Sequence, residues 1–237
     1  MNSPTRCLGE IKLSERATQM SLFDTKPDAV SEKKKSPDRI RAVFKIKEDD
    51  ELAGVSSLAE LTRIMDDCTR CELSAQRTHI VFGEGNPEAK LMLIGEGPGL
   101  NEDKTGRPFV GAAGQLLDRI LASAGFSREE VFITNIVKCR PPQNRLPESS
   151  ECASCLPYLA CQMRLIEPKI VCCLGALATQ TLVDPKARIT RLRGTWHDKG
   201  GIKIMPTFHP AALLRDPSKK RPVWEDFQKI KEEYARL

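Results

Sequence analysis

Four cysteines constrain the fold of this 237-residue chain more than any other feature. Cys68 and Cys71 form a tight pair, and Cys139 and Cys155 follow far downstream, sixteen residues apart. Thiolates at these positions would join the start of a domain to its middle. Ligation of an iron–sulfur cluster and ligation of zinc both fit the spacing.

Composition favours metal ligation over a disulfide framework. The chain has nine cysteines, an odd number, and its N-terminus lacks the apolar stretch of a secretory signal. No apolar run reaches the roughly 20 residues that span a bilayer, so we expect a cytoplasmic protein. The net charge of +5 points weakly to an anionic partner, and ordinary surface charge would explain it equally well.

Residues 1–50 are expected to form a disordered, charged tail, and residues 51–237 one domain. The segment 31–38 is charged, contains proline and has few large apolar residues, so it cannot bury enough surface to become ordered. Within the tail, Gln19-Met20-Ser21-Leu22-Phe23 resembles the short peptide by which bacterial proteins dock on the replication sliding clamp. Such short matches also arise by chance, and a start at Met20 instead of Met1 would remove Gln19.

Apolar strands alternate with helices from residue 57 onward. The expected strands are 91–94, 131–137, 170–174 and 202–208. The expected helices are one from Leu58 that leads to Cys68, then 111–124, 152–166 with a start signal at 147–149, 176–182 and 223–235. Because the strands are apolar throughout, they predict a mostly parallel sheet covered by helices on both faces.

Polar and glycine residues follow three of these strands. A glycine-rich run, 95–99, comes after the first strand, Asn135 lies near the end of the second, and His209 follows the fourth. Ligands of such sheets bind beyond the carboxyl ends of the strands, so the convergence predicts a single active site.

The glycine-rich run is not interpreted as a dinucleotide fingerprint. That fingerprint leads straight into a helix, whereas here Pro98 and an expected charged loop, 101–104, intervene. Glycines in this run would instead let backbone amides approach a planar or anionic ligand closely.

Further motifs, in the same order from about Leu61 to the C-terminus, closely resemble those of family 4 uracil-DNA glycosylases. They are Gly95-Glu96-Gly97-Pro98-Gly99 with Glu102-Asp103, Gly106-Arg107-Pro108-Phe109-Val110-Gly111, Ala113-Gly114-Gln115-Leu116-Leu117, Asn135-Ile136-Val137-Lys138-Cys139-Arg140-Pro141-Pro142, and His209-Pro210-Ala211-Ala212-Leu213-Leu214-Arg215.

This resemblance implies a three-layer α/β/α sandwich with a four-stranded, mostly parallel central sheet and a [4Fe–4S] cluster. It also implies a monofunctional enzyme of base excision repair that hydrolyses the N-glycosidic bond of deoxyuridine in DNA. The products would be uracil and an abasic site. We expect a monomer associated with the nucleoid. The covalently trapping relatives carry a Gln in the glycine motif and an inserted basic loop, and neither is present here.

The family pattern places the cluster ligands at Cys68, Cys71, Cys139 and Cys155. Cys152 competes as the last ligand, because it lies three residues from Cys155 on a similar helix face. Cys155 is preferred because the family's last ligand precedes an x-x-aromatic-Leu segment, as in Leu156-Pro157-Tyr158-Leu159. Zinc remains chemically possible. The other cysteines are interpreted as buried or incidental: Cys7, Cys161, Cys172 and Cys173.

The resemblance also assigns the base pocket. Phe109 would stack on the extruded base, which is favoured over a role in the core. Asn135 would match the N3–H and O4 of uracil, the alternative being a strand-end cap. His209 would donate to O2 as negative charge builds on the departing base. Gly95, Glu96 and Gly97 complete the expected substrate site, and His79 and His197 are interpreted as structural.

The residue that handles the water is left open. Glu96 could hold the water, stabilise the cationic sugar or only fix the loop, and Glu102 and Asp103 compete for the role. Gly97 carries no acid, so the aspartate-led mechanism of other uracil glycosylases cannot be transferred. We therefore name Glu96, His209 and Glu102 as the candidate catalytic residues.

Basic residues cluster late in the chain, near the expected site. Surface helices often carry such charges without a partner, but phosphate contacts are the favoured interpretation here. Leu213, Leu214 or Arg215 is expected to fill the gap left by the flipped base. The candidate DNA contacts are Arg193, Leu213, Arg215, Lys219, Lys220 and Arg221.

A non-catalytic DNA-binding module with the same fold and cluster is the rival interpretation. It is disfavoured because DNA binding alone needs no polar constellation at the strand ends. An enzyme that acts on free nucleotides is disfavoured by the late basic clusters.

Overall fold

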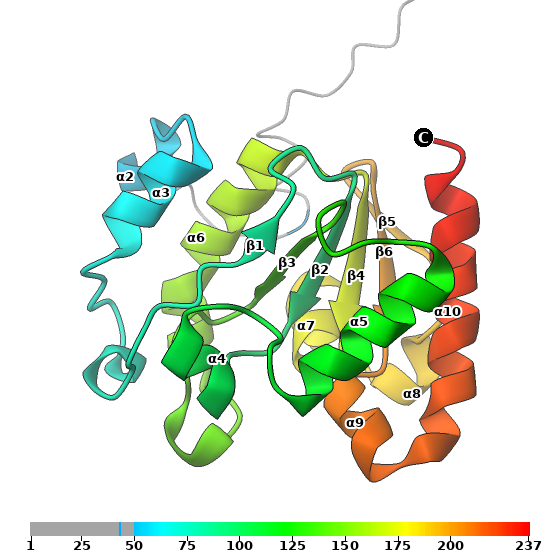
Figure 1. The fold of residues 1–237 in the computed structure, drawn as a ribbon. Coiled ribbons are helices and arrows are strands. Elements are labelled where there is room, and N and C mark those ends of the chain that lie inside the picture. Colours follow the sequence, from blue (N-terminus) through cyan, green and yellow to red (C-terminus); the bar gives the residue numbers. More distant parts are fainter. Residues whose placement is uncertain (1–42, 44–49) are drawn as a thin grey trace, which may run out of the picture. The chain divides into compact units, whose positions relative to one another are not determined.

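The computed structural model describes Val43 and residues 50–237 (Figure 1). The clamp-like segment 19–23 and Cys7 lie outside the described residues. In the described part, no helix is both long and apolar enough to cross a membrane.

A six-stranded sheet forms the centre of this unit, in the order β1-β3-β2-β4-β6-β5. The four central strands run parallel, and the two edge strands pair antiparallel with their neighbours. The strands are β1 (Glu84–Gly85), β2 (Leu91–Gly95), β3 (Phe132–Asn135), β4 (Ile170–Leu174), β5 (His197–Lys199) and β6 (Ile202–Thr207). The predicted α/β class is therefore confirmed.

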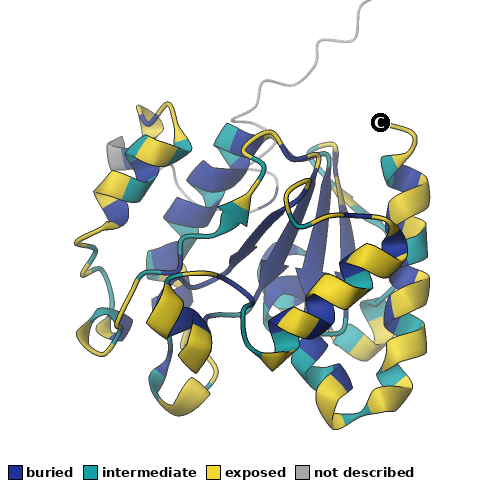
Figure 2. Cartoon of the chain, in the orientation of Figure 1, coloured by how far each residue is buried: buried dark blue, intermediate teal, exposed yellow. Residues whose placement is uncertain are grey.

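The expectation of four strands was wrong because it omitted the two edges. Both edge strands are very short and only partly buried, so neither gives a continuous apolar run in the sequence. The four central strands, in contrast, are almost completely buried, as the dark blue arrows of Figure 2 show. Their apolar runs therefore predicted both their existence and their parallel arrangement.

Helices surround this sheet. They are α2 (Asp50–Ala53), α3 (Leu58–Met65), α4 (Leu100–Thr105), α5 (Ala112–Ala124), α6 (Ser149–Ile166), α7 (Ala176–Leu182), α8 (Ile189–Leu192), α9 (Pro210–Arg215) and α10 (Lys220–Tyr234), with short 3₁₀ turns at Glu72–Ala75, Pro142–Asn144 and Pro217–Lys219.

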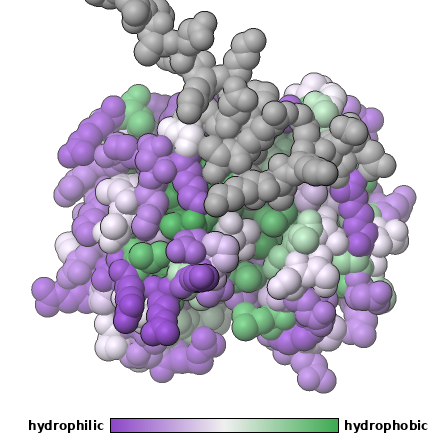
Figure 3. Space-filling view, turned by 180° about the vertical axis from the view of Figure 1, so that it is seen from behind, coloured by the Kyte–Doolittle hydropathy of each residue, from purple (hydrophilic) through white to green (hydrophobic). Residues whose placement is uncertain are grey.

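Side chains of successive strand residues enter two separate hydrophobic cores, one on each face of the sheet. Met92 and Ile94 pack in one core with α3, α6 and α7, while Leu91 and Leu93 pack in the other with α5, α9 and α10. Seen from behind, the visible side chains of the described residues are mostly hydrophilic at the periphery and more hydrophobic toward the centre (Figure 3).

Local signals explain why several predicted helix ends were accurate. The Ser57 hydroxyl accepts a hydrogen bond from the Glu60 amide and caps the start of α3. Gly125 ends α5 in the left-handed conformation that favours glycine. The predicted strand 131–137 is longer than the observed β3, since the chain leaves the sheet after Asn135.

The segment 101–104 is part of helix α4, so the expectation of a charged loop was wrong. The Glu102 carboxylate accepts a hydrogen bond from the Gly99 amide at 3.1 Å, and Gly106 ends the helix with a φ of 71°. The expected loop 101–104 can therefore no longer be cited against a dinucleotide fingerprint, whereas Pro98 still can. A polar six-residue helix between glycines has no apolar periodicity that would reveal it.

Val43 lies within the predicted tail but is buried in the core that contains α3 and α6. The folded unit thus includes a residue before position 51, and the expected boundary was drawn too late.

Leu213 and Leu214 are neighbours on α9 with opposite environments. Leu213 is 1% exposed and packs in the core with α5 and α10, whereas Leu214 is 47% exposed. The expectation that Leu213 contacts DNA is therefore wrong, since its side chain is already enclosed by the protein.

We expect Leu213→Ala to lower the free energy of unfolding by about 2–5 kcal/mol, because it leaves a cavity in the core. Leu214→Ala, the matched control one residue away, should change that free energy by no more than about 0.5 kcal/mol. Urea denaturation followed by circular dichroism measures both. Equal losses in the two variants would contradict the packing of α9 described above.

Candidate active site

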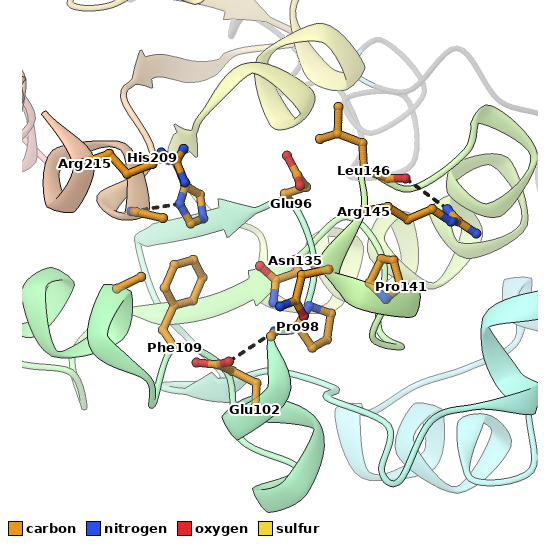
Figure 4. A pocket seen from close by; sticks show the side chains of 15 residues that line it. Glu96, Pro98, Glu102, Phe109, Asn135, Pro141, Arg145, Leu146, His209 and Arg215 are labelled. Carbon is orange, nitrogen blue, oxygen red and sulfur yellow. Dashed lines mark hydrogen bonds between the residues drawn. The ribbon is translucent and has the colours of Figure 1, made fainter.

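A cavity of about 500 Å³ lies at the carboxyl ends of the parallel strands. Five sequence-predicted polar or aromatic residues line it, together with Gly97: Glu96, Glu102, Phe109, Asn135 and His209. Figure 4 shows the side chains of Phe109, His209, Asn135 and Glu96 gathered around one space. The fold thus brings together residues that are more than 110 positions apart in the sequence.

Gly95 forms the floor beneath this group. A Cβ atom at this position would lie 2.4 Å from Asn135 Oδ1 and 2.6 Å from Phe109 Cζ, both too close for any side chain. Gly95 pairs with Asn135 across β2 and β3. Because Gly95 has no side chain, the Asn135 amide and the Phe109 ring have room next to the end of β2.

Asn135 presents an unpaired acceptor. The residue is 1% exposed, and its buried Oδ1 has no hydrogen-bond partner among the described residues. Buried polar atoms are almost always hydrogen-bonded, so an unpaired acceptor in a cavity wall indicates a site for a donor from a ligand.

His209 is held as a neutral donor. Its Nδ1 accepts a hydrogen bond from the Ala211 amide at 3.1 Å, drawn as a dashed line in Figure 4. Burial lowers the pKa of this imidazole from 6.5 to about 4, with a contribution from the nearby Arg215 charge that Glu102 opposes. With Nδ1 occupied as an acceptor, the proton of the neutral ring resides on Nε2.

Phe109 lies beside His209 in a constrained backbone conformation. The two ring centroids are 5.6 Å apart, and Phe109 has a φ of 52°, in the left-handed region. The Arg128 guanidinium donates to the carbonyl oxygens of Pro108 and Phe109. Gly114 allows a further close approach, since a Cβ there would lie 1.8 Å from the Phe109 oxygen. The ring position is therefore fixed from both sides of the loop.

Glu96 and Glu102 differ in how their carboxylates are engaged. Glu102 accepts hydrogen bonds from three backbone amides, those of Gly99, Val110 and Gly111, at 3.1, 2.9 and 2.8 Å. Glu96 shows no side-chain hydrogen bond within the described part of the chain. Burial raises the pKa of the Glu96 carboxyl above 4.5, against the opposing charge of Arg215.

Asp103, the third acid considered, lies outside the cavity wall. Its carboxylate accepts hydrogen bonds from the Thr78 amide at 2.9 Å and from the Thr78 hydroxyl at 2.7 Å. It therefore joins α4 to the segment before β1.

The four predicted cysteine ligands line a second, smaller cavity: Cys68, Cys71, Cys139 and Cys155. Cys152 does not line it, which favours Cys155 as the fourth member. The Arg77 guanidinium donates to Cys139 Sγ at 3.6 Å and to the Cys68 carbonyl at 2.5 Å. Among the described residues, no group of three or more His, Cys, Asp and Glu side chains converges on the position of a single metal ion.

Arg193 forms an ion pair within the protein. Its guanidinium donates to the fully buried carboxylate of Asp226, with the Nε–Oδ2 pair at 3.0 Å, and to the Pro222 carbonyl at 2.6 Å. Arg193 therefore has a structural ion pair, and its DNA contact stays a prediction. Sequence could not reveal the ion pair, because Asp226 lies 33 positions away.

The other predicted basic contacts remain on the surface. Arg215 lines the active-site cavity. Lys219 is paired with Asp216 at 3.0 Å, and Arg221 with Glu225 at 3.1 Å, both within the same chain segment. Lys220 is exposed at the start of α10.

Sequence reasoning did not assign three residues that support these sites. Arg128 holds the Phe109 loop, Leu146 is a 67%-exposed apolar residue in the wall of the active-site cavity, and Lys138 is fully buried between the two cavities. Lys138 belongs to the motif from Asn135 to Cys139 that the sequence analysis quoted. A lysine next to a predicted ligand cysteine, however, gives no indication in the sequence that its side chain is buried.

Comparison with known proteins identifies the family of this chain. The Uracil DNA glycosylase superfamily matches residues 82–228. The type-4 uracil-DNA glycosylase of Thermotoga maritima is 49% identical over 168 residues, which cover 69% of this chain and 88% of the relative. The type-4 enzymes of Sulfurisphaera tokodaii and Archaeoglobus fulgidus are 44% and 41% identical, and the matches cover 75% of this chain in both cases and 85% and 94% of the relatives. The family predicted from the motifs is confirmed, and the chain belongs to the uracil DNA glycosylase superfamily and, within it, to the type-4 uracil-DNA glycosylases.

Proposed function

We propose that this protein hydrolyses the N-glycosidic bond of deoxyuridine in DNA, releasing uracil and leaving an abasic site for base excision repair. The observation that carries the proposal is the buried, unpaired Oδ1 of Asn135 beside Phe109 and His209 in one cavity. Family membership supports the same activity.

Asn135 supplies the selection for uracil. Its Oδ1 accepts from uracil N3–H, and its amide nitrogen donates to O4. Cytosine presents an acceptor at N3 and a donor at N4, so a fixed amide faces it with two mismatched groups. Because the residue is 1% exposed, water cannot relieve that mismatch.

His209 and Phe109 act on the base once it has left the helix. Phe109 stacks on its face, which contributes about 1–3 kcal/mol. Negative charge builds on uracil O2 as the glycosidic bond breaks, and the Nε2–H of neutral His209 donates to it. A donor that is already oriented by the Ala211 amide stabilises this charge without reorganising.

Glu96 is the better candidate for positioning the water that attacks the sugar. Its carboxylate faces the cavity and has no hydrogen bond to the described protein, whereas the Glu102 oxygens are engaged by three amides. The ionised Glu96 would also stabilise the oxocarbenium-like sugar. We assign Glu102 to holding the loop that carries Phe109.

Cys68, Cys71, Cys139 and Cys155 would hold a [4Fe–4S] cluster. Four thiols around one cavity are the donor set of such a cluster, whose ligands bind different irons and need not converge on a single point. Base excision transfers no electrons, so the bound group would supply structural support between the start and the middle of the domain.

Further partners are also proposed. Arg215, Lys219, Lys220 and Arg221 would contact DNA phosphates beside the cavity, and the enzyme would act as a monomer on chromosomal DNA in the cytoplasm. The segment 19–23 would dock on the replication sliding clamp. The rival function, a DNA-binding module without catalysis, leaves the unpaired amide and the oriented imidazole without a role.

The glycosylase assay with Asn135 variants tests the function directly. Wild-type protein should release uracil from a single-uracil oligonucleotide, detected by alkaline cleavage at the abasic site. Asn135→Ala should lower the single-turnover rate by about 10²-fold, the scale of a lost oriented partner. Asn135→Asp should raise activity on cytosine relative to uracil, since a carboxyl group can accept from N4.

Asn86→Asp is the matched control, because this amide only accepts a turn hydrogen bond from Glu88. Full uracil excision by Asn135→Ala would remove the residue from substrate recognition, and no excision by the wild type would contradict the function.

The acid limb of the pH profile should report Glu96. Its carboxylate works when ionised, and its raised pKa means that activity falls at a higher pH than for an ordinary carboxyl group. His209, with a pKa of about 4, stays neutral above pH 5 and adds no limb there. Single-turnover rates from pH 4.5 to 8 should therefore decline toward acid in the wild type and be flat, at a lower level, in Glu96→Gln. An unchanged acid limb in Glu96→Gln would exclude the assignment, provided that circular dichroism shows both proteins folded.

The clamp proposal is tested with a peptide of residues 15–27 and a purified bacterial sliding clamp. Micromolar binding is expected, because two apolar anchors bury a modest area while the peptide loses conformational entropy. Replacing both Leu22 and Phe23 by Ala should abolish binding by the peptide and, in the full protein, leave excision on naked oligonucleotides unchanged. Equal binding by the double variant would show that the match is coincidental.

A further inference from the structure

Lys138 is a fully buried lysine between the two cavities. Its side chain is 1% exposed, and Nζ lies 2.5 Å from Thr134 Oγ1, 2.7 Å from Gln162 Oε1 and 2.9 Å from the Asn135 carbonyl oxygen. Thr134 and Asn135 belong to β3 and Gln162 to α6. One amino group therefore joins the end of a central strand to the helix that also carries Cys155.

The hydrogen bonds around this amino group place three acceptors against it. The Thr134 hydroxyl donates to the Phe82 carbonyl at 2.8 Å, and the Gln162 amide nitrogen donates to the same carbonyl at 2.9 Å. Thr134 Oγ1 and Gln162 Oε1 are thus left as acceptors toward Nζ, and the third partner is a carbonyl. The three N–H groups of the ammonium form match these three acceptors.

This buried cation has no carboxylate partner within the described residues. Its three hydrogen-bond partners are all neutral, and a buried charge without a counter-charge is strongly disfavoured. Lys138 does, however, line the cysteine cavity together with Cys155 and the adjacent Cys139.

The cysteine cavity has a marked excess of positive charge. Its charged lining residues are Arg70, Arg77 and Lys138, and no Asp or Glu lines it among the residues that the structure describes. The guanidinium of Arg70 lies over the Tyr158 ring at 4.8 Å, and that of Arg77 reaches Cys139 Sγ. Four thiolates around a metal group would carry net negative charge and complete this environment.

We propose that Lys138 is the buried counter-cation of an anionic four-cysteine metal site. The proposal rests on metal binding by the four cysteines, as inferred above.

Lys138→Met tests the charge, and Thr134→Val is the matched control. Met fills a similar volume without a charge, whereas Val removes one hydrogen-bond acceptor and leaves the ammonium in place. The holoprotein is purified without air, its iron and zinc are counted, and metal release to a chelator is followed by visible absorbance or a metal dye. Lys138→Met should release metal about 10–100-fold faster than the wild type, the scale of losing a partner that supports metal ligands, and Thr134→Val much less.

Two further measurements extend the test. Lys138→Gln, which keeps two N–H donors but no charge, should also release metal faster, and it replaces Lys138→Met if that variant does not fold. For an iron–sulfur cluster, the reduction potential should fall in both neutral variants, because a nearby cation favours the more negative reduced state. Thr134→Val should leave the potential near the wild-type value.

Equal release rates and equal potentials in Lys138→Met, Lys138→Gln and Thr134→Val would overturn the proposal, because the charge would then have no effect. Wild-type protein that binds neither iron nor zinc would also overturn it. Metal release is measured without DNA, so failure of the proposed glycosylase activity would leave this test intact and separately interpretable.

Discussion

The pairing of Gly95 with Asn135 at the ends of β2 and β3 is the contact on which the active site depends. Parallel pairing continues just beyond the strands, where the Ile136 amide donates to the Gly95 carbonyl and the Val137 amide to the Glu96 carbonyl. The glycine-rich run and the Asn135 motif therefore leave the sheet side by side. Since Gly95 has no side chain, the Asn135 amide and the Phe109 ring occupy the space above it.

The short segment from Asn135 to Cys139 contributes residues to the walls of both cavities. Asn135 lines the active-site cavity, whereas the buried Lys138 and the adjacent Cys139 line the cysteine cavity. Helix α6 supports the same region with Gln162 and Cys155. The residues proposed for base recognition and for metal binding are thus only a few positions apart along one chain segment, and the hydrogen bonds of Lys138 join the Asn135 carbonyl to Gln162 of α6.

Sequence predicted the elements whose signals are local. The bounds of β4 and α7 were predicted as observed, since a fully buried strand and the helix after it give a continuous apolar run followed by a turn. The edge strands and α4 were missed because two or three partly buried residues, or a polar turn between glycines, carry no such pattern. The predicted pocket residues do line one cavity. They could be predicted because the family motifs identify them by their positions in the sequence.

Predictions failed where the environment comes from distant parts of the chain. Leu213 was expected at the DNA surface, but α5 and α10 enclose it. The ion pair of Arg193 with the buried Asp226 was not predicted. The burial of Lys138 among acceptors from β3 and α6 was not predicted, because no local sequence pattern indicates it. These cases share one cause: burial and charge pairing are properties of the tertiary structure.

The left-handed backbone of Phe109 has a consequence for the order of events on DNA. Arg128 and the close contact of Gly114 hold this loop through contacts within the protein, so the aromatic platform that we propose for the base would not need a nucleotide to form. A platform that is already rigid loses little conformational entropy on binding. The slow conformational step would then lie in the nucleic acid, where the nucleotide rotates out of its stack and enters a preformed site.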